Sequence, residues 1–124
     1  MAGPTEELKE RTKQFALRVV KLFRLLPRTA EARVIGGQLL RSGTAVAANY
    51  RAACRARSKA EFVAKIGVVV EESDETVFWL ELLVDGGIIA KHRLEALHTE
   101  ANELLAIFAA SQRTAKFALA SARK

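Results

Sequence analysis

The chain has 124 residues, a net charge of +6 and a composition that is half hydrophobic, which suits one domain, residues 1–124, with a packed core. A single cysteine, Cys54, excludes an intrachain disulfide and favours a reducing compartment. No apolar run approaches the roughly 20 residues of a membrane span, and the start does not resemble a secretory signal. We therefore expect a cytoplasmic protein with no membrane partner.

Four helices are predicted, at approximately residues 5–26, 29–53, 58–86 and 90–112. Along each segment, apolar residues recur in alternating steps of four and three, the spacing of one helix face. Short connections make successive helices antiparallel. The predicted fold is therefore all-α, an up-and-down antiparallel four-helix bundle. A basic tail, residues 113–124, either extends the last helix or frays.

The first helix, residues 5–26, is expected to begin with Thr5 as its N-cap and to end before Pro27. In the second helix, residues 29–53, three glycines interrupt a pattern that otherwise favours helix, namely Gly36, Gly37 and Gly43. We interpret Gly36 and Gly37 as making room for bulky rings of the third helix, near Thr76 and Trp79.

The third helix, residues 58–86, organises the chain. It opens with Ser58 and Glu61 at capping-box spacing and closes at Gly86-Gly87, the residue type that takes the left-handed conformation after a helix. Residues 77–84 are apolar nearly all round, so this helix is buried on more than one side. We predict that its second face contacts another copy of the chain through the side chains of Phe78, Trp79 and Leu82.

Polar residues also lie on the predicted inner faces of the second and third helices. Polar residues at such positions usually fix the register of a bundle rather than perform catalysis. We expect Ser42 and Ser73 to come close, with Arg41 hydrogen-bonded nearby. The predicted structural layer comprises Gln38, Ser42, Asn49 and Ser73.

Elsewhere the sequence gives little indication of a metal-binding or catalytic site. A di-iron bundle needs two Glu-x-x-His motifs, and only Glu95–His98 fits, so we predict no metal and no cofactor. The acidic residues of the third helix fall outside its inner face, which favours a solvated surface or contact with a neighbouring subunit; they are Glu71, Glu72, Asp74 and Glu75. An enzyme or a metal-binding bundle is therefore a distant third reading.

Charge is unevenly distributed along the chain. Residues 1–65 carry 14 Lys/Arg and 5 Asp/Glu, whereas residues 66–124 carry 6 and 9. Such asymmetry indicates a polyanionic partner, attraction between unlike faces in an assembly, or simply a soluble charged surface. Tyr50 is the one candidate for an exposed aromatic in this basic half. The candidate nucleic-acid-binding residues are Arg41, Arg51, Arg55, Arg57 and Lys59.

Residues 27–89 resemble the four-helix bundle proteins also called 23S rRNA intervening-sequence proteins. The matching positions include Pro27, Glu31, Gln38-Leu39, Arg41-Ser42, Ala48-Asn49, Ser58-Lys59, Glu61-Phe62, Glu75, Leu80 and Gly87. The family is also similar to the accessory variability determinant of diversity-generating retroelements, which binds a reverse transcriptase and nucleic acid. The resemblance implies a four-helix bundle that assembles into a homopentamer.

The sequence leads to two alternative predictions of function. The first is a non-enzymatic oligomer that binds RNA or DNA through its basic face, by phosphate contacts and with a strong dependence on salt. The alternative is a homo-oligomeric scaffold or adaptor that presents the same surface to an acidic protein partner.

Overall fold

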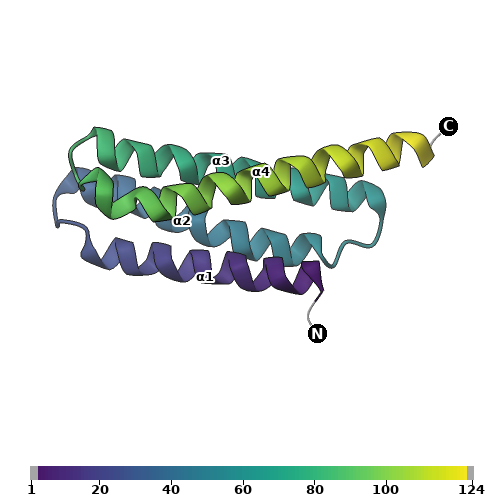
Figure 1. Ribbon diagram of the computed structural model, residues 1–124, viewed down its shortest axis with the longest axis horizontal. Helices are drawn as coiled ribbons and strands as arrows, with labels where there is room; N and C mark the ends of the chain where they lie inside the picture. Colours follow the sequence, from purple (N-terminus) through teal and green to yellow (C-terminus); the bar gives the residue numbers. More distant parts are fainter. Residues whose placement is uncertain (1–2, 123–124) are drawn as a thin grey trace.

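The computed structural model describes residues 3–122, which form four helices: α1, Pro4–Leu25; α2, Ala30–Ala53; α3, Lys59–Asp85; and α4, Lys91–Ala122. Figure 1 shows that they run up and down along one long axis, as the short connections predict. No strand occurs among these residues, and none of their helices is both long and apolar enough to cross a membrane. The all-α, up-and-down bundle is confirmed.

The helix ends follow local capping chemistry. The Thr29 and Ser58 side chains accept hydrogen bonds from the amides of Ala32 and Glu61, and so cap α2 and α3. Gly87 adopts a φ of +70°, the left-handed conformation expected after α3. The prediction for α1 is wrong: Gly3 holds the N-cap position, because Pro4 fits the first helical turn, where no N–H is needed.

The capping box at α3 is also modified. The hydroxyl of Ser58 accepts from the Glu61 amide at 3.0 Å, as predicted. The Glu61 carboxylate accepts from the amide of Arg57 at 3.3 Å, one residue before the expected Ser58 amide. The carboxylate therefore holds the α2–α3 connection against the start of α3.

The core comes from the predicted inner faces of all four helices. The largest side chains with almost no exposure are Phe15, Leu39, Ile66, Leu80, Leu83, Leu94, Leu104 and Phe108. Because the buried side chains of each helix recur every three or four residues, each helix buries one stripe and leaves its charged face in water. The rings of Tyr50 and Phe108 pack with their centroids 5.1 Å apart, joining α2 to α4.

The glycines of α2 pack against α1, which corrects the sequence interpretation. A Cβ on Gly43 would lie 2.9 Å from Cγ2 of Val19, and one on Gly36 would lie 2.5 Å from Cδ1 of Leu26. Gly37 has no atom within 4 Å of its missing Cβ, so it makes room for no ring. The two close glycines let the backbones of α1 and α2 approach.

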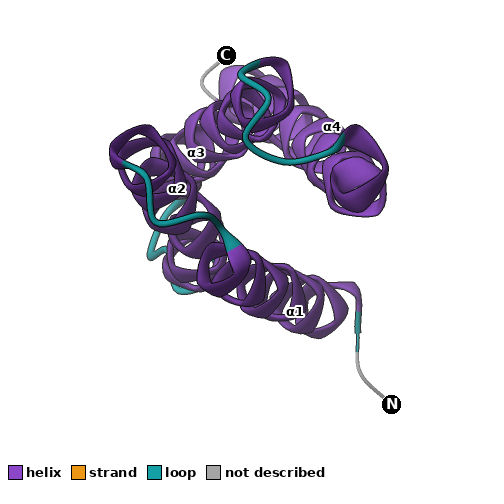
Figure 2. Ribbon diagram, turned by 90° about the vertical axis from the view of Figure 1, so that its left-hand side faces the viewer, coloured by secondary structure: helices purple, strands orange, loops and turns teal. Residues whose placement is uncertain are grey.

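The helices follow one another around the bundle, and α1 and α4 make the least contact of any neighbouring pair (Figure 2). An ion pair joins them: the Arg11 guanidinium lies 2.6 Å from Oε1 of Glu100 and 3.6 Å from Oε2 of Glu103. The tail up to Ala122 extends α4, and its end projects beyond the α2–α3 connection in Figure 1. We call residues 113–122 the α4 overhang; the predicted tail residues 123 and 124 lie outside the described part.

Candidate nucleic-acid interface

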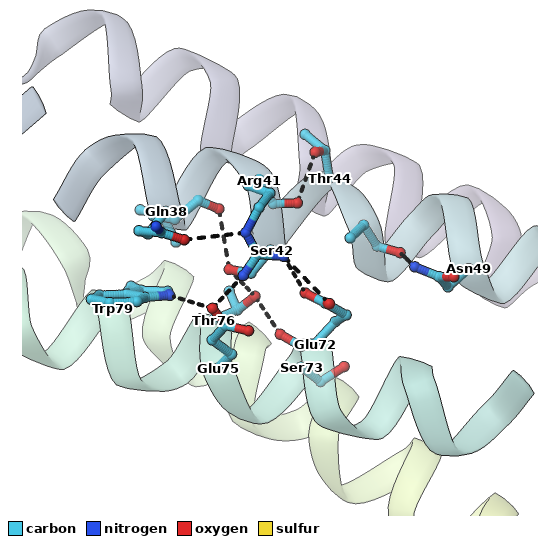
Figure 3. A network of polar contacts seen from close by, with 12 residues as sticks. Gln38, Arg41, Ser42, Thr44, Asn49, Glu72, Ser73, Glu75, Thr76 and Trp79 are labelled. Atoms are coloured by element: carbon cyan, nitrogen blue, oxygen red, sulfur yellow. Dashed lines mark hydrogen bonds and ion pairs between the residues drawn. The ribbon is translucent and has the colours of Figure 1, made fainter. Parts of the chain in front are cut away.

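Arg41 lies at the centre of a polar network between α2 and α3 (Figure 3). Its guanidinium pairs with Glu75 and, at 3.1 Å, with Glu72, while its Nε donates to Gln38 at 3.2 Å. The indole of Trp79 donates to Glu75 at 3.1 Å. Arg41 is thus neutralised within its own chain, and these two acids contact α2 of the same subunit.

These contacts act on the ionisation of the carboxyl groups. Hydrogen bonds from Arg41 and Trp79 hold the pKa of Glu75 below its usual value. A hydrogen bond from Arg11 likewise lowers the pKa of Glu100, although burial opposes the shift. Both carboxylates therefore stay charged at neutral pH, which favours the α2–α3 and α1–α4 ion pairs.

Hydroxyl groups occupy the buried part of the α2–α3 seam. The Thr76 hydroxyl lies 2.9 Å from Oγ of Ser42 and 2.7 Å from the carbonyl oxygen of Glu72. The Ser73 hydroxyl donates to the carbonyl of Val69 on its own helix at 2.7 Å, so the expected approach of Ser42 to Ser73 stays a prediction. A single tie, Ser42 to Thr76, therefore joins the helices at this level and supports a structural role.

Asn49 does not join this seam. Its Nδ2 donates to the carbonyl of Ala45 at 2.9 Å, one turn back on α2. The amide is thus satisfied within its own helix, and Figure 3 shows it apart from the Arg41 network.

Four exposed cations gather where α2 ends and α3 begins; we call them the basic corner, made of Arg51, Arg55, Arg57 and Lys59. Among the ion pairs of residues 3–122, none involves any of the four. By contrast, the predicted candidate Arg41 and the basic residue Arg11 each face two carboxylates. The basic corner therefore keeps its charge available to a partner.

A groove of about 630 Å³ adjoins the basic corner. Its walls come from the start of α1, the α2–α3 connection and the α4 overhang. The residues that line it include Thr5, Tyr50, Arg57, Ser58, Lys59, Phe62, Ser111, Ala115 and Ala118. The sequence did not indicate this groove, because its walls are far apart along the chain.

Tyr50 differs from its predicted role as an exposed aromatic. It is 6% exposed, and burial together with the neighbouring Cys54 raises its pKa to about 12. The exposed aromatic at this end is instead Phe117, which is 77% exposed on the α4 overhang.

The predicted contact face of α3 lies on the surface. Phe78 is 51% exposed, and its ring packs edge-on against that of Trp79, with centroids 5.0 Å apart. Trp79 and Leu82 are half-buried. The three side chains form an apolar patch on one helix, and its partner remains a prediction.

Histidine and cysteine add no obvious catalytic set. Nε2 of His98 lies 3.0 Å from Oε2 of Glu81, which links α4 to α3 at the surface. Cys54 is a half-buried free thiol. Across residues 3–122, no three His, Cys, Asp or Glu side chains converge as metal ligands.

Together, the antiparallel helices, the hydroxyl-containing seam and the basic corner define an all-α four-helix bundle with exposed cations at the α2–α3 connection. The sequence profile of the 23S rRNA-intervening sequence protein family matches residues 6–110. The chain therefore belongs to this family.

A solved structure supports the same assignment. It is a protein with unknown function from the S23 ribosomal protein family of Bacteroides thetaiotaomicron VPI-5482. The two are 31% identical with a TM-score of 0.81, over 88% of this chain and 97% of that chain. No curated protein matches the sequence significantly. The similarity to the accessory variability determinant of diversity-generating retroelements stays a prediction.

Proposed function

We propose that the chain is a non-enzymatic, homo-oligomeric bundle that binds RNA or DNA through the basic corner. The observation that carries this proposal is the contrast in charge pairing. Arg11 and Arg41 are held by carboxylates within the fold, whereas no carboxylate of residues 3–122 lies within ion-pair distance of the four cations of the basic corner. Unpaired, exposed Lys and Arg side chains suit the phosphates of a nucleic acid.

Binding of this kind is governed by phosphate contacts rather than by base sequence. Each neutralised phosphate releases a condensed counterion, so affinity falls as salt rises. An assembly multiplies the effect, because one strand can contact several copies of the same weak site.

Reversing three charges tests this function. In a fluorescence-anisotropy titration from about 50 to about 200 mM salt, we expect R51E/R55E/R57E to bind RNA and DNA oligonucleotides at least about tenfold more weakly than the native chain. We also expect a shallower salt dependence, because fewer counterions are released.

The matched control is R24E/R28E/R33E, which makes the same charge change around the α1–α2 connection, where α1 ends and α2 begins. It should retain more than half of the native affinity if the basic corner is the contact surface. Equal losses of affinity in both variants would show only a general effect of charge. No binding by the native chain at the lowest salt would contradict the proposed function. That last result would favour the alternative, a scaffold for an acidic protein partner.

Homo-oligomerisation, with a pentamer as the expected number, is supported by the patch of Phe78, Trp79 and Leu82. A Phe side chain that is half exposed beside a Trp leaves apolar area that a second copy can cover. We expect F78E to lower the molar mass measured by light scattering to that of a smaller species or a monomer. V34E is the control, because Val34 is also exposed (66%) but lies on α2. An unchanged mass for F78E would contradict this interface.

A further inference from the structure

The groove beside the basic corner is lined by aromatic, hydroxyl and cationic side chains. Its lining includes the partly buried Phe62 and the buried Tyr50. Hydroxyls reach it from three elements, namely Thr5 of α1, Ser58 before α3 and Ser111 of α4. Arg57 and Lys59 are also part of its lining, so the groove offers aromatic, hydroxyl and cationic groups together.

The volume of the groove suits a small ligand. A volume of about 630 Å³ falls in the range of small-molecule sites, which are mostly apolar with a few polar groups. An amphipathic helix of a protein partner instead needs an extended channel for anchors spaced over two or more turns. Here the α4 overhang and the start of α1 wall the groove on two sides.

The groups present match a nucleotide in particular. A base offers an apolar face for Phe62 and an edge with donors and acceptors for the hydroxyls. The phosphates on either side of that base would lie against Arg57 and Lys59.

We infer that this groove binds one unpaired nucleobase of a strand whose phosphates lie on the basic corner. The inference rests on the proposed nucleic-acid binding and adds a preference to it: a base stacked in a duplex cannot enter the groove, whereas a base in a single strand or a bulge can.

A preference for the unpaired strand distinguishes the groove from charge alone. A duplex has the higher charge density and releases more counterions per contact, so phosphate contacts by themselves favour the duplex. We expect the native chain to bind an unstructured single strand about tenfold more tightly than a blunt duplex of equal length, through the contact with one base.

Filling the groove is the test. In A115L/A118L, two leucines from the α4 overhang occupy it, and we expect the single-strand preference to disappear while duplex binding stays at the native level. The control A106L/A110L places the same leucines at exposed positions of α4 outside the groove lining and should keep the preference. Unchanged duplex binding also shows that the filled variant is folded.

The other outcomes distinguish a failure of the groove inference from a failure of the proposed function. Equal binding of single strand and duplex by the native chain, or a preference retained in A115L/A118L, would overturn the groove inference and leave the proposed function standing. Displacement of the single strand by a glutamate-rich peptide from the native chain, but not from A115L/A118L, would assign the groove to an acidic protein segment and overturn it too. Binding of neither probe would instead remove the proposed function.

Discussion

Replacing Phe108 with alanine is expected to lower the free energy of unfolding by about 3–5 kcal/mol. The ring is fully buried, and it packs against Tyr50 at 5.1 Å where α2 meets α4. Its removal leaves a cavity among side chains of several helices that cannot all collapse into it. Because folded domains are stable by only about 5–15 kcal/mol, this single change takes a large share of the total. Urea unfolding at fixed protein concentration measures it.

Phe117 provides the control on the same helix. Its side chain is 77% exposed on the α4 overhang, so F117A should change the free energy of unfolding by no more than about 0.5 kcal/mol. Similar losses in F108A and F117A would mean that the overhang is packed in solution, and would contradict its projecting position. A small loss in F108A would contradict the burial of the ring.

A leucine in place of Gly43 should destabilise the bundle by about 2–3 kcal/mol. The added Cβ alone would lie 2.9 Å and 3.1 Å from the two Cγ atoms of Val19, which is completely buried. Val19 is branched at Cβ and has few alternative rotamers in a helix, so the backbones of α1 and α2 must separate. Thermal and urea unfolding should both show the loss.

The comparison substitution is Gly37 to alanine. No atom lies within 4 Å of the position of its missing Cβ, so the gain in helix propensity is unopposed. We expect G37A to raise the free energy of unfolding by about 0.5–1 kcal/mol. A stabilised G43L, or a strongly destabilised G37A, would show that the helices pack in another register.

The periodicity of the apolar residues was sufficient to predict the fold. Apolar residues that follow the spacing of four and three along each helix are those that the structure buries, such as Phe15, Leu39, Ile66 and Leu104. This agreement arises because a helix that must bury one stripe shows that stripe in its spacing, whatever its neighbours are. The same argument explains the failure at Gly36: spacing indicates that a face is crowded but not which helix crowds it, and the neighbour is α1 rather than α3.

The candidate site was harder to predict from the sequence than the fold. Arg41 belongs to the same run of basic residues as Arg51, and only the α2–α3 register shows that it faces Glu72 and Glu75. The α4 overhang was ambiguous because its sequence carries neither a glycine nor a proline to end the helix. The groove is lined by residues more than a hundred positions apart, and no local sequence pattern predicts that they lie together.

The order of the helices also bears on how the chain reaches its structure. Each helix packs chiefly on the one before or after it, and the contact between the first and the last is the slightest. Little loop-closure entropy must therefore be lost before packing begins, a topology typical of proteins that fold in microseconds to milliseconds. Such a chain can bury its core while still close to the ribosome that made it, helix hairpin by helix hairpin, with little time for its apolar stripes to meet those of other chains.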